Sequence, residues 1–231
     1  MHAWNLPRRR APRQVATGGP HGAMGLPSTE PTTVRPLFGG AITTELPERY
    51  VDVSDFRPVP DNQEVWTDAS KDESVVVEIV ERVAVGPSDD EGAAAWFFRD
   101  LAEVNGASAS EILGVRDLSV DDLPSVNGPF AAASACVGRQ VMSKGRDGVE
   151  AANVVEVIVA NVRLVQVETD LLVTLNRALV VADGSQAAAQ TGAGTIAEGF
   201  GGGGVDEWGP GWEVLRRVLA SLRVEDWGLF G

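Results

Sequence analysis

The stretch that decides the fold class is "VVEVIVANVRLVQVETDLLVTLNRALVV", residues 154–181. It is rich in valine and other apolar residues, a composition that favours buried strands. The polar triplet "ETD" separates its two apolar runs, which predicts two long strands paired as an antiparallel hairpin. Charges interrupt the stretch too often for it to span a bilayer, at Glu156, Arg163, Glu168 and Asp170. We therefore expect a soluble protein built around a sheet, with no membrane association.

Three further segments have patterns typical of strands. "AITTELP" (41–47) alternates briefly and stops at Pro47, and "SVVVEIVERVAV" (74–85) contains too much valine to favour a helix. "FAAASACVGRQVM" (130–142) indicates a strand of small residues, in which the lone Cys136 is expected to be a buried thiol. Together with the hairpin, these segments predict a mainly antiparallel sheet.

Two segments have helical spacing of their apolar residues. "GAAAWFFRDLAEVNG" (92–106) repeats near 3.6 residues and ends in a helix-stop pair, Asn-Gly. "GPGWEVLRRVLASLRVEDWGLFG" (209–231) has one apolar helical face, while its arginines can stay in water. The residues expected to face the core are Trp96, Phe97, Leu101 and Val104 in the first helix, Trp212, Leu215, Leu219 and Leu222 in the second, and Trp66 elsewhere. The prediction is one α+β domain, a central antiparallel sheet covered by helices.

The chain divides into a basic head and a folded body. Residues 1–35 are rich in Pro, Gly, Thr and Arg without a regular period, which predicts a disordered N-terminal extension. A transit peptide, or a weak nuclear-import patch at "RRRAPR", are alternative interpretations of this segment. Residues 36–231 are predicted to form a single domain, with a flexible Gly-rich insertion at 184–204 that lacks the lysine of a phosphate-binding loop.

The charge of the body limits its partners. The chain has 33 Asp and Glu against 19 Lys and Arg, a formal net charge of −14. Residues 1–35 contain five arginines and one glutamate, so the remainder is even more acidic than the total. An acidic body repels phosphate backbones and attracts basic protein surfaces. Direct binding of nucleic acid is therefore not expected.

The side-chain sets that catalysis requires are not found in the sequence of the body. The only two histidines of the whole chain, His2 and His21, lie in the head. A Ser/His/Asp or Cys/His arrangement therefore has no histidine base in the folded part. One cysteine cannot build a thiolate metal site, and the acidic runs lack calcium-loop spacing. We therefore expect a binding protein, with no catalytic residues, no metal and no cofactor.

The segment "VSDFRPVPDNQEVW", residues 53–66, is the stiffest candidate for a binding surface. Pro58 and Pro60 fix their own φ angles and bias the preceding residues toward extended conformations. Carboxylates held on such a segment lose little conformational entropy when they bind a partner. A structural turn at "PDN" (60–62) would also explain the prolines.

This segment and five others resemble the family of Ran guanine-nucleotide release factors. The resemblance begins with "LFGGAITTELP" (37–47) and covers essentially all of residues 36–231, but 109–150 and the Gly-rich insertion match only loosely. Its most specific block contains "DVSD" and "RPVPDNQEV". The other blocks, in family order, are "DESVVVEIVERV" (72–83), "WFFRDLAEVNGAS" (96–108), "VRLVQVETDLLVTLN" (162–176) and "LRVEDWGLFG" (222–231).

The resemblance implies a fold, a function and a site. The fold is that of the PsbP family, an α/β/α sandwich with a central antiparallel sheet of about six strands. The implied function is binding of the GTPase Ran and release of its nucleotide, without bond chemistry, in the nucleus and cytoplasm and in support of protein transport. The sequence leaves the oligomeric state open, and a monomer is assumed. The implied Ran-binding residues are Asp52, Asp61, Glu64, Glu78 and Glu81, with Asp55 and Arg57 as weaker candidates.

Two alternatives and one geometric difficulty accompany this interpretation. A PsbP-like photosynthetic lumen protein would share the fold, and an adaptor could bind a GTPase without releasing its nucleotide. Side chains three residues apart on a regular strand point to opposite faces. Glu78 and Glu81 can therefore share one surface only if their strand ends, twists or bulges between them.

Overall fold

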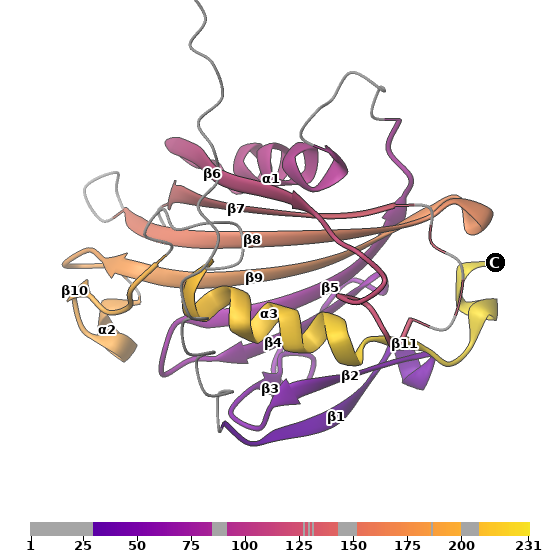
Figure 1. Cartoon of the computed structure of the whole chain (residues 1–231). Coiled ribbons are helices and arrows are strands. Elements are labelled where there is room, and N and C mark those ends of the chain that lie inside the picture. Colours follow the sequence, from indigo (N-terminus) through magenta and orange to yellow (C-terminus); the bar gives the residue numbers. More distant parts are fainter. Residues whose placement is uncertain are drawn as a thin grey trace, which may run out of the picture.

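The computed structural model describes residues 30–84, 92–126, 128, 130, 132–142, 152–185, 187–199 and 208–231. Its main sheet has eight strands in the order β3-β4-β5-β9-β8-β7-β6, with β10 paired to β9, and a second sheet has the order β1-β2-β11 (Figure 1). The main strands are β3 (Val51–Asp52), β4 (Gln63–Asp68), β5 (Glu73–Glu81), β6 (Ala109–Asp117), β7 (Ala132–Met142), β8 (Asn153–Leu164), β9 (Thr169–Val181) and β10 (Gly194–Thr195). The smaller sheet consists of β1 (Thr32–Leu37), β2 (Ile42–Pro47) and β11 (Arg223–Val224).

The predicted hairpin forms the centre of the main sheet. β8 and β9 pair antiparallel, with Ile158 opposite Leu175, and the short 3-10 helix η3 (Val165–Val167) joins them. Because both faces of these strands are covered along most of their length, their residues are buried almost without alternation. The strand predictions at 41–47, 74–85 and 130–142 are confirmed as β2, β5 and β7 with shifted ends, while β6 was not predicted.

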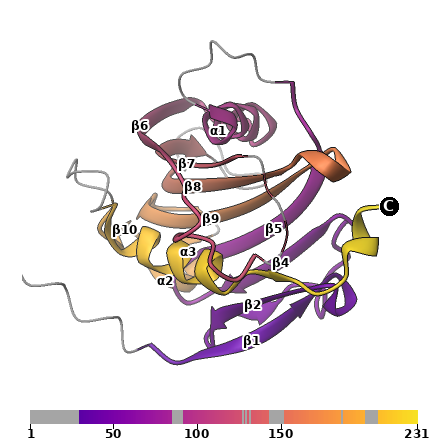
Figure 2. The ribbon, with the colours of Figure 1, turned by 45° about the vertical axis from the view of Figure 1, so that its right-hand side comes forward.

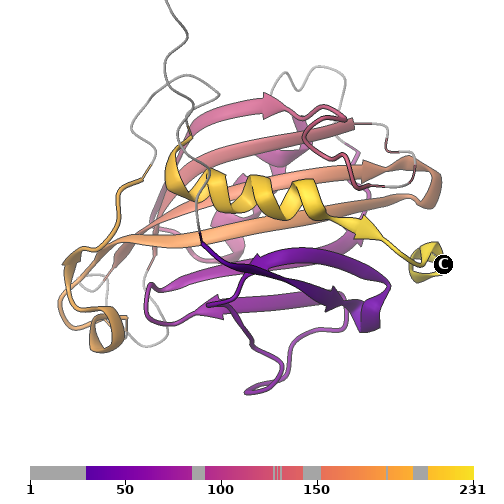
Figure 3. The ribbon, with the colours of Figure 1, turned by 60° about the horizontal axis from the view of Figure 1, so that its bottom comes forward.

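Helices lie on both faces of the main sheet. α3 (Gly209–Ser221) and the β1-β2-β11 sheet pack on one face, which we call face A, and α1 (Gly92–Val104) packs on the other, face B (Figure 2). Figure 3 shows α3 lying along β8 and β9, with β1 and β2 beside it. The mixed, antiparallel α+β character is therefore confirmed. The predicted number of about six strands is too low for the main sheet, and the separate small sheet was not foreseen.

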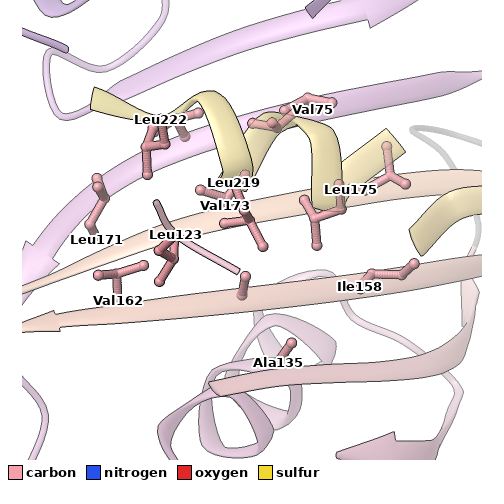
Figure 4. Packing of buried hydrophobic residues seen from close by; sticks show 14 of the residues in the cluster. Val75, Leu123, Ala135, Ile158, Val162, Leu171, Val173, Leu175, Leu219 and Leu222 are labelled. Atoms are coloured by element: carbon pink, nitrogen blue, oxygen red, sulfur yellow. The ribbon is translucent and has the colours of Figure 1, made fainter. Parts of the chain in front are cut away.

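The core of face A joins α3 to both sheets. Leu219 and Leu222 contact the same buried cluster as Val75 of β5 and Val173 of β9 (Figure 4). The predicted inward face of this helix is confirmed, since Trp212, Leu215, Leu219 and Leu222 are all buried. Trp66 is also buried in this core, as predicted.

The orientation of α1 differs from the prediction. Phe97 and Phe98 are buried against face B together with small alanines, but Trp96 is 40% exposed and Val104 is 75% exposed. The helix therefore packs through a narrow alanine-rich stripe around Phe98. The prediction that Trp96 and Val104 face the core is wrong. It followed the spacing of the large apolar side chains, whereas small alanines make up most of the buried face.

The first strand begins earlier than the sequence indicated. β1 starts at Thr32, inside the stretch interpreted as a disordered extension, and residues 1–29 lie outside the described part. The predicted insertion at 184–204 carries the short helix α2 (Ala188–Thr191) and β10 up to residue 199. Residue 186 and residues 200–204 of that insertion also lie outside the described part.

Ion pairs buried in the main sheet bind its strands together. The fully buried Asp170 of β9 accepts hydrogen bonds from Arg163 Nε at 2.9 Å, Arg163 Nη2 at 3.0 Å and the Val83 amide at 3.0 Å. Arg163 also donates to the Val83 carbonyl, so the pair holds the chain leaving β5 against the central hairpin. At the opposite end, Arg177 bridges Glu73 and Glu156 across three strands. Buried charges are tolerated because each has a partner of opposite charge.

Candidate functional site

The loop between β3 and β4, residues 53–62, is braced by its own backbone. Val53 is buried, its amide donates to Val65 O at 2.9 Å, and its carbonyl accepts from the amides of Phe56 and Arg57. The Gln63 amide donates to Pro60 O at 2.9 Å, which closes a turn through Asp61 and Asn62. Pro60 therefore occupies the first position of this turn, and the structural turn expected at "PDN" is present.

Three of the sequence-predicted residues converge on one pocket beside this loop. Asp52, Asp61 and Glu64 all line a hollow of about 420 Å³, together with Phe38 and Leu229. Asp52 lies opposite the buried Trp66 in the β3–β4 pair, so its side chain points to face A. Glu64 lies opposite Val77 and points to the same face. We call these three residues the acidic rim.

The conformation of Glu64 is fixed by a backbone contact from outside its own sheet. Its Oε1 accepts a hydrogen bond from the Phe38 amide, in the 3-10 turn η1 (Phe38–Gly40) between β1 and β2. Gly39 and Gly40 have positive φ angles, which let the chain turn tightly at this point. Sequence reasoning missed Phe38, although the "FGG" triplet marks a turn beside the motif.

Burial raises the pKa of Glu64 above its ordinary value. Loss of water is the main cause, and the negative charge of Asp52 acts in the same direction. The hydrogen bond from Phe38 opposes both effects by stabilising the carboxylate. A partner that brings positive charge to the rim would relieve this repulsion. The rim is therefore electrostatically prepared for a cation.

Glu78 and Glu81 lie at the same end of the sheet but on opposite faces. β5 pairs with β9 from Glu73 to Glu81 without a register shift, so no bulge brings the two side chains together. Glu78 lies on face B and accepts hydrogen bonds from Gln63 Nε2 at 2.8 Å and Asn62 Nδ2 at 3.3 Å. Glu81 is exposed at the strand end, opposite Thr169. Thus the expected single surface is divided between the acidic rim and the edge of face B.

The two weaker candidates are both exposed on the loop. Asp55 lies at its outer side, and Arg57 lines a second hollow on face B that also includes Glu78. The side chains of Asn62 and Gln63 connect the two groups, because both bind Glu78 while Gln63 also lines the rim pocket. Sequence reasoning assigned no role to these two amides, although they stand inside the "PDNQE" motif.

The described residues contain no group of three or more His, Cys, Asp or Glu side chains that could hold a metal ion. Among the helices of the described part, none is long and apolar enough to cross a membrane. What the site offers is a fixed set of carboxylates around a shallow pocket.

The fold and the site together define an α+β domain with a braced acidic rim beside a pocket. The family model of the Ran-interacting Mog1 protein matches residues 35–178. The chain is 40% identical over 148 residues to the Ran guanine nucleotide release factor of Homo sapiens. The matched region covers 64% of this chain and 77% of that protein. It is 31% identical over 162 residues to the nuclear import protein MOG1 of Saccharomyces cerevisiae, covering 65% of this chain and 68% of that protein.

A solved structure is similar to this chain over most of its length. The Saccharomyces cerevisiae Ran-binding protein Mog1p superposes with a TM-score of 0.58 at 25% identity, covering 88% of this chain and all of that chain. The protein described here belongs to the family of Ran-interacting Mog1 proteins.

Proposed function

We propose that this protein binds the small GTPase Ran and promotes release of its guanine nucleotide, in support of protein transport between nucleus and cytoplasm. Membership of the Ran-interacting Mog1 family carries the proposal. Curated relatives named as Ran guanine nucleotide release factors and nuclear import proteins support it. The same match favours the Ran-binding branch over a PsbP-like lumen protein. The protein acts in the nucleus and cytoplasm, as a monomer.

The binding site is the acidic rim with its neighbours at the same end of the sheet. Asp52, Asp61 and Glu64 receive a basic surface of Ran, and Glu78 and Glu81 extend the contact around the sheet edge. The convergence of three carboxylates on one pocket supports this assignment. Because the loop is braced before binding, the carboxylates lose little entropy on docking. Complementary charge also accelerates the encounter of the two proteins.

Release of nucleotide requires no bond chemistry from this protein. If it binds Ran more tightly when the nucleotide is loosely held, reciprocity requires that it weakens nucleotide affinity by the same factor. Each tenfold loosening needs about 1.4 kcal/mol of differential contact. A few charge pairs desolvated in an interface supply that amount. Release is thus a consequence of where the rim docks.

Calorimetry of Ran binding with charge-reversed variants tests the site. Asp61 is exposed, so Asp61→Lys should leave the fold intact, and Asp61→Lys combined with Glu64→Lys should abolish measurable binding. Asp183→Lys is the matched control, because this exposed carboxylate follows β9 at the opposite end of the main sheet. Unchanged Ran affinity in a folded double variant would reject the assignment of the rim.

A further inference from the structure

Face B of the main sheet is only half covered by the described residues. α1 contacts β6, β7 and β8, whereas β4, β5 and β9 form the floor of a trough of about 730 Å³. Val65, Val76 and Thr174 belong to this floor. The end of α1 forms one wall, and the turn at residues 53–57 forms the other. The trough therefore lies between a helix end and the loop that carries the Ran-binding motif.

The two most exposed large hydrophobic side chains of the described residues both line this trough. Phe56 is 76% exposed and Val104 is 75% exposed, and they stand on opposite walls. A single exposed apolar side chain is ordinary on a protein surface. Two of them around one hollow, with half-buried Val65 and Val76 on its floor, provide apolar surface of the kind that marks association sites, among polar lining residues such as Thr67 and Asn176.

The braced turn holds Phe56 outward. The Phe56 amide donates to Val53 O at 3.0 Å, and Asp52 Oδ1 accepts from the Ser54 amide at 2.8 Å. The backbone of the turn is therefore fixed before any partner arrives. Aromatic side chains presented in this way are typical anchors of protein interfaces.

The charges around the trough favour a basic occupant. Its charged lining residues are Asp72, Glu73, Glu78 and Arg57. Glu73 is buried and already paired with Arg49 and Arg177, so Glu78 is the carboxylate that a basic partner would meet. The carboxyl end of α1, beside Val104, carries the partial negative charge of the helix dipole, and its last turn contains no basic residue to offset it. The trough also adjoins the pocket of the acidic rim at the edge of the sheet, since Gln63 and Val65 line both hollows.

We propose that this trough is the second half of the Ran interface and receives a segment of Ran that carries apolar side chains flanked by lysine or arginine. Phe56 and Val104 are its apolar anchors, and Glu78 pairs with the flanking cations. This inference rests on the proposed function, because it assigns the trough to the same partner. The rim and Glu78 contribute the charge-dependent part of the binding energy, and Phe56 and Val104 contribute the apolar part.

Titration calorimetry with purified Ran at two salt concentrations separates these contributions. Combining Phe56→Ser with Val104→Ser should weaken binding at least tenfold and leave the salt dependence of the affinity unchanged, because no charge is removed. It should also reduce the negative heat-capacity change of binding, which reports apolar burial. Val34→Ser is the matched control, since Val34 is 62% exposed on β1 in the other sheet.

The outcomes distinguish the trough from the function itself. Phe56→Leu in place of Phe56→Ser should recover most of the lost affinity, because it retains apolar bulk. If the unmodified protein binds Ran but the double serine variant binds within twofold of it, the trough is not part of the interface and the proposed function stands. If the unmodified protein does not bind Ran, the proposed function fails and the inference fails with it.

Discussion

Replacement of Arg163 by methionine should destabilise the protein far more than loss of an exposed arginine. Asp170 is fully buried, and Arg163 donates two of the three hydrogen bonds described for its carboxylate. Arg163→Met leaves this charge in the sheet with the Val83 amide as its remaining donor. Removal of one partner of a buried ion pair typically costs about 3–5 kcal/mol. For a domain of this size, that loss lowers the melting temperature by about 6–20 °C.

The control for this prediction is Arg216→Met. Arg216 pairs with Glu213 at 3.0 Å, but both side chains are about half exposed. Such surface pairs contribute about 0–1 kcal/mol. Urea unfolding followed by tryptophan fluorescence measures both variants on the same scale. A loss in Arg163→Met within 1 kcal/mol of that in Arg216→Met would refute the reasoning.

A second variant identifies the origin of the loss. Combining Arg163→Met with Asp170→Leu removes both charges, so most of the stability should return. Val83 is only half buried, and its backbone can then turn to water for hydrogen bonds. No recovery in this double variant would mean that packing, rather than an unpaired charge, explains the loss.

Three other predictions concern titration and packing. Tyr50 is the only tyrosine, and its hydroxyl donates a hydrogen bond to buried Glu73. Burial and the negative charge of Glu73 raise the pKa of Tyr50 above its ordinary value. Ultraviolet titration should therefore show no tyrosinate near pH 10 while the protein is folded. Leu215→Ala, at a fully buried position in α3, should lower the free energy of unfolding in urea by about 2–5 kcal/mol. A loss below about 1 kcal/mol would contradict the close packing of α3 in the core. Because the pKa of Glu64 is raised in the folded protein, the stability that its protonated form contributes is lost as pH rises through that pKa. At pH 7, Glu64→Gln should therefore be at least as stable as the unmodified protein in thermal unfolding. The same variant should bind Ran more weakly in calorimetry. A clear loss of stability at pH 7 would contradict the prediction for Glu64→Gln.

Local patterns were sufficient to predict the centre of the fold. The β8–β9 hairpin follows from two valine-rich runs around one polar triplet, which is information carried within 28 residues. β6 escaped prediction because a register shift between Ile112 and Gly114 breaks its alternation, and Gly114 approaches Trp208 closely. β1 escaped because it is a polar edge strand containing Pro36.

The site was predictable in composition and only partly in geometry. The motif identified Asp52, Asp61 and Glu64, and their convergence depends on the pairing of β3 with β4 and on the distant Phe38 amide. Alternation along a strand correctly separated Glu78 from Glu81, because β5 runs without a bulge. The pairing of β3 with β4 and the contact from the Phe38 amide join separate parts of the chain, so they cannot be predicted from a local sequence window.

Nucleotide release from Ran tests the central claim most directly. Ran loaded with labelled GDP or GTP is mixed with excess unlabelled nucleotide, and the rate of label loss is measured with and without this protein. The unmodified protein and Asp183→Lys should accelerate release for at least one of the two nucleotides, and Asp61→Lys should lose most of that effect. An unchanged rate with the unmodified protein, at concentrations where it binds Ran, would show an adaptor rather than a release factor and would contradict the account.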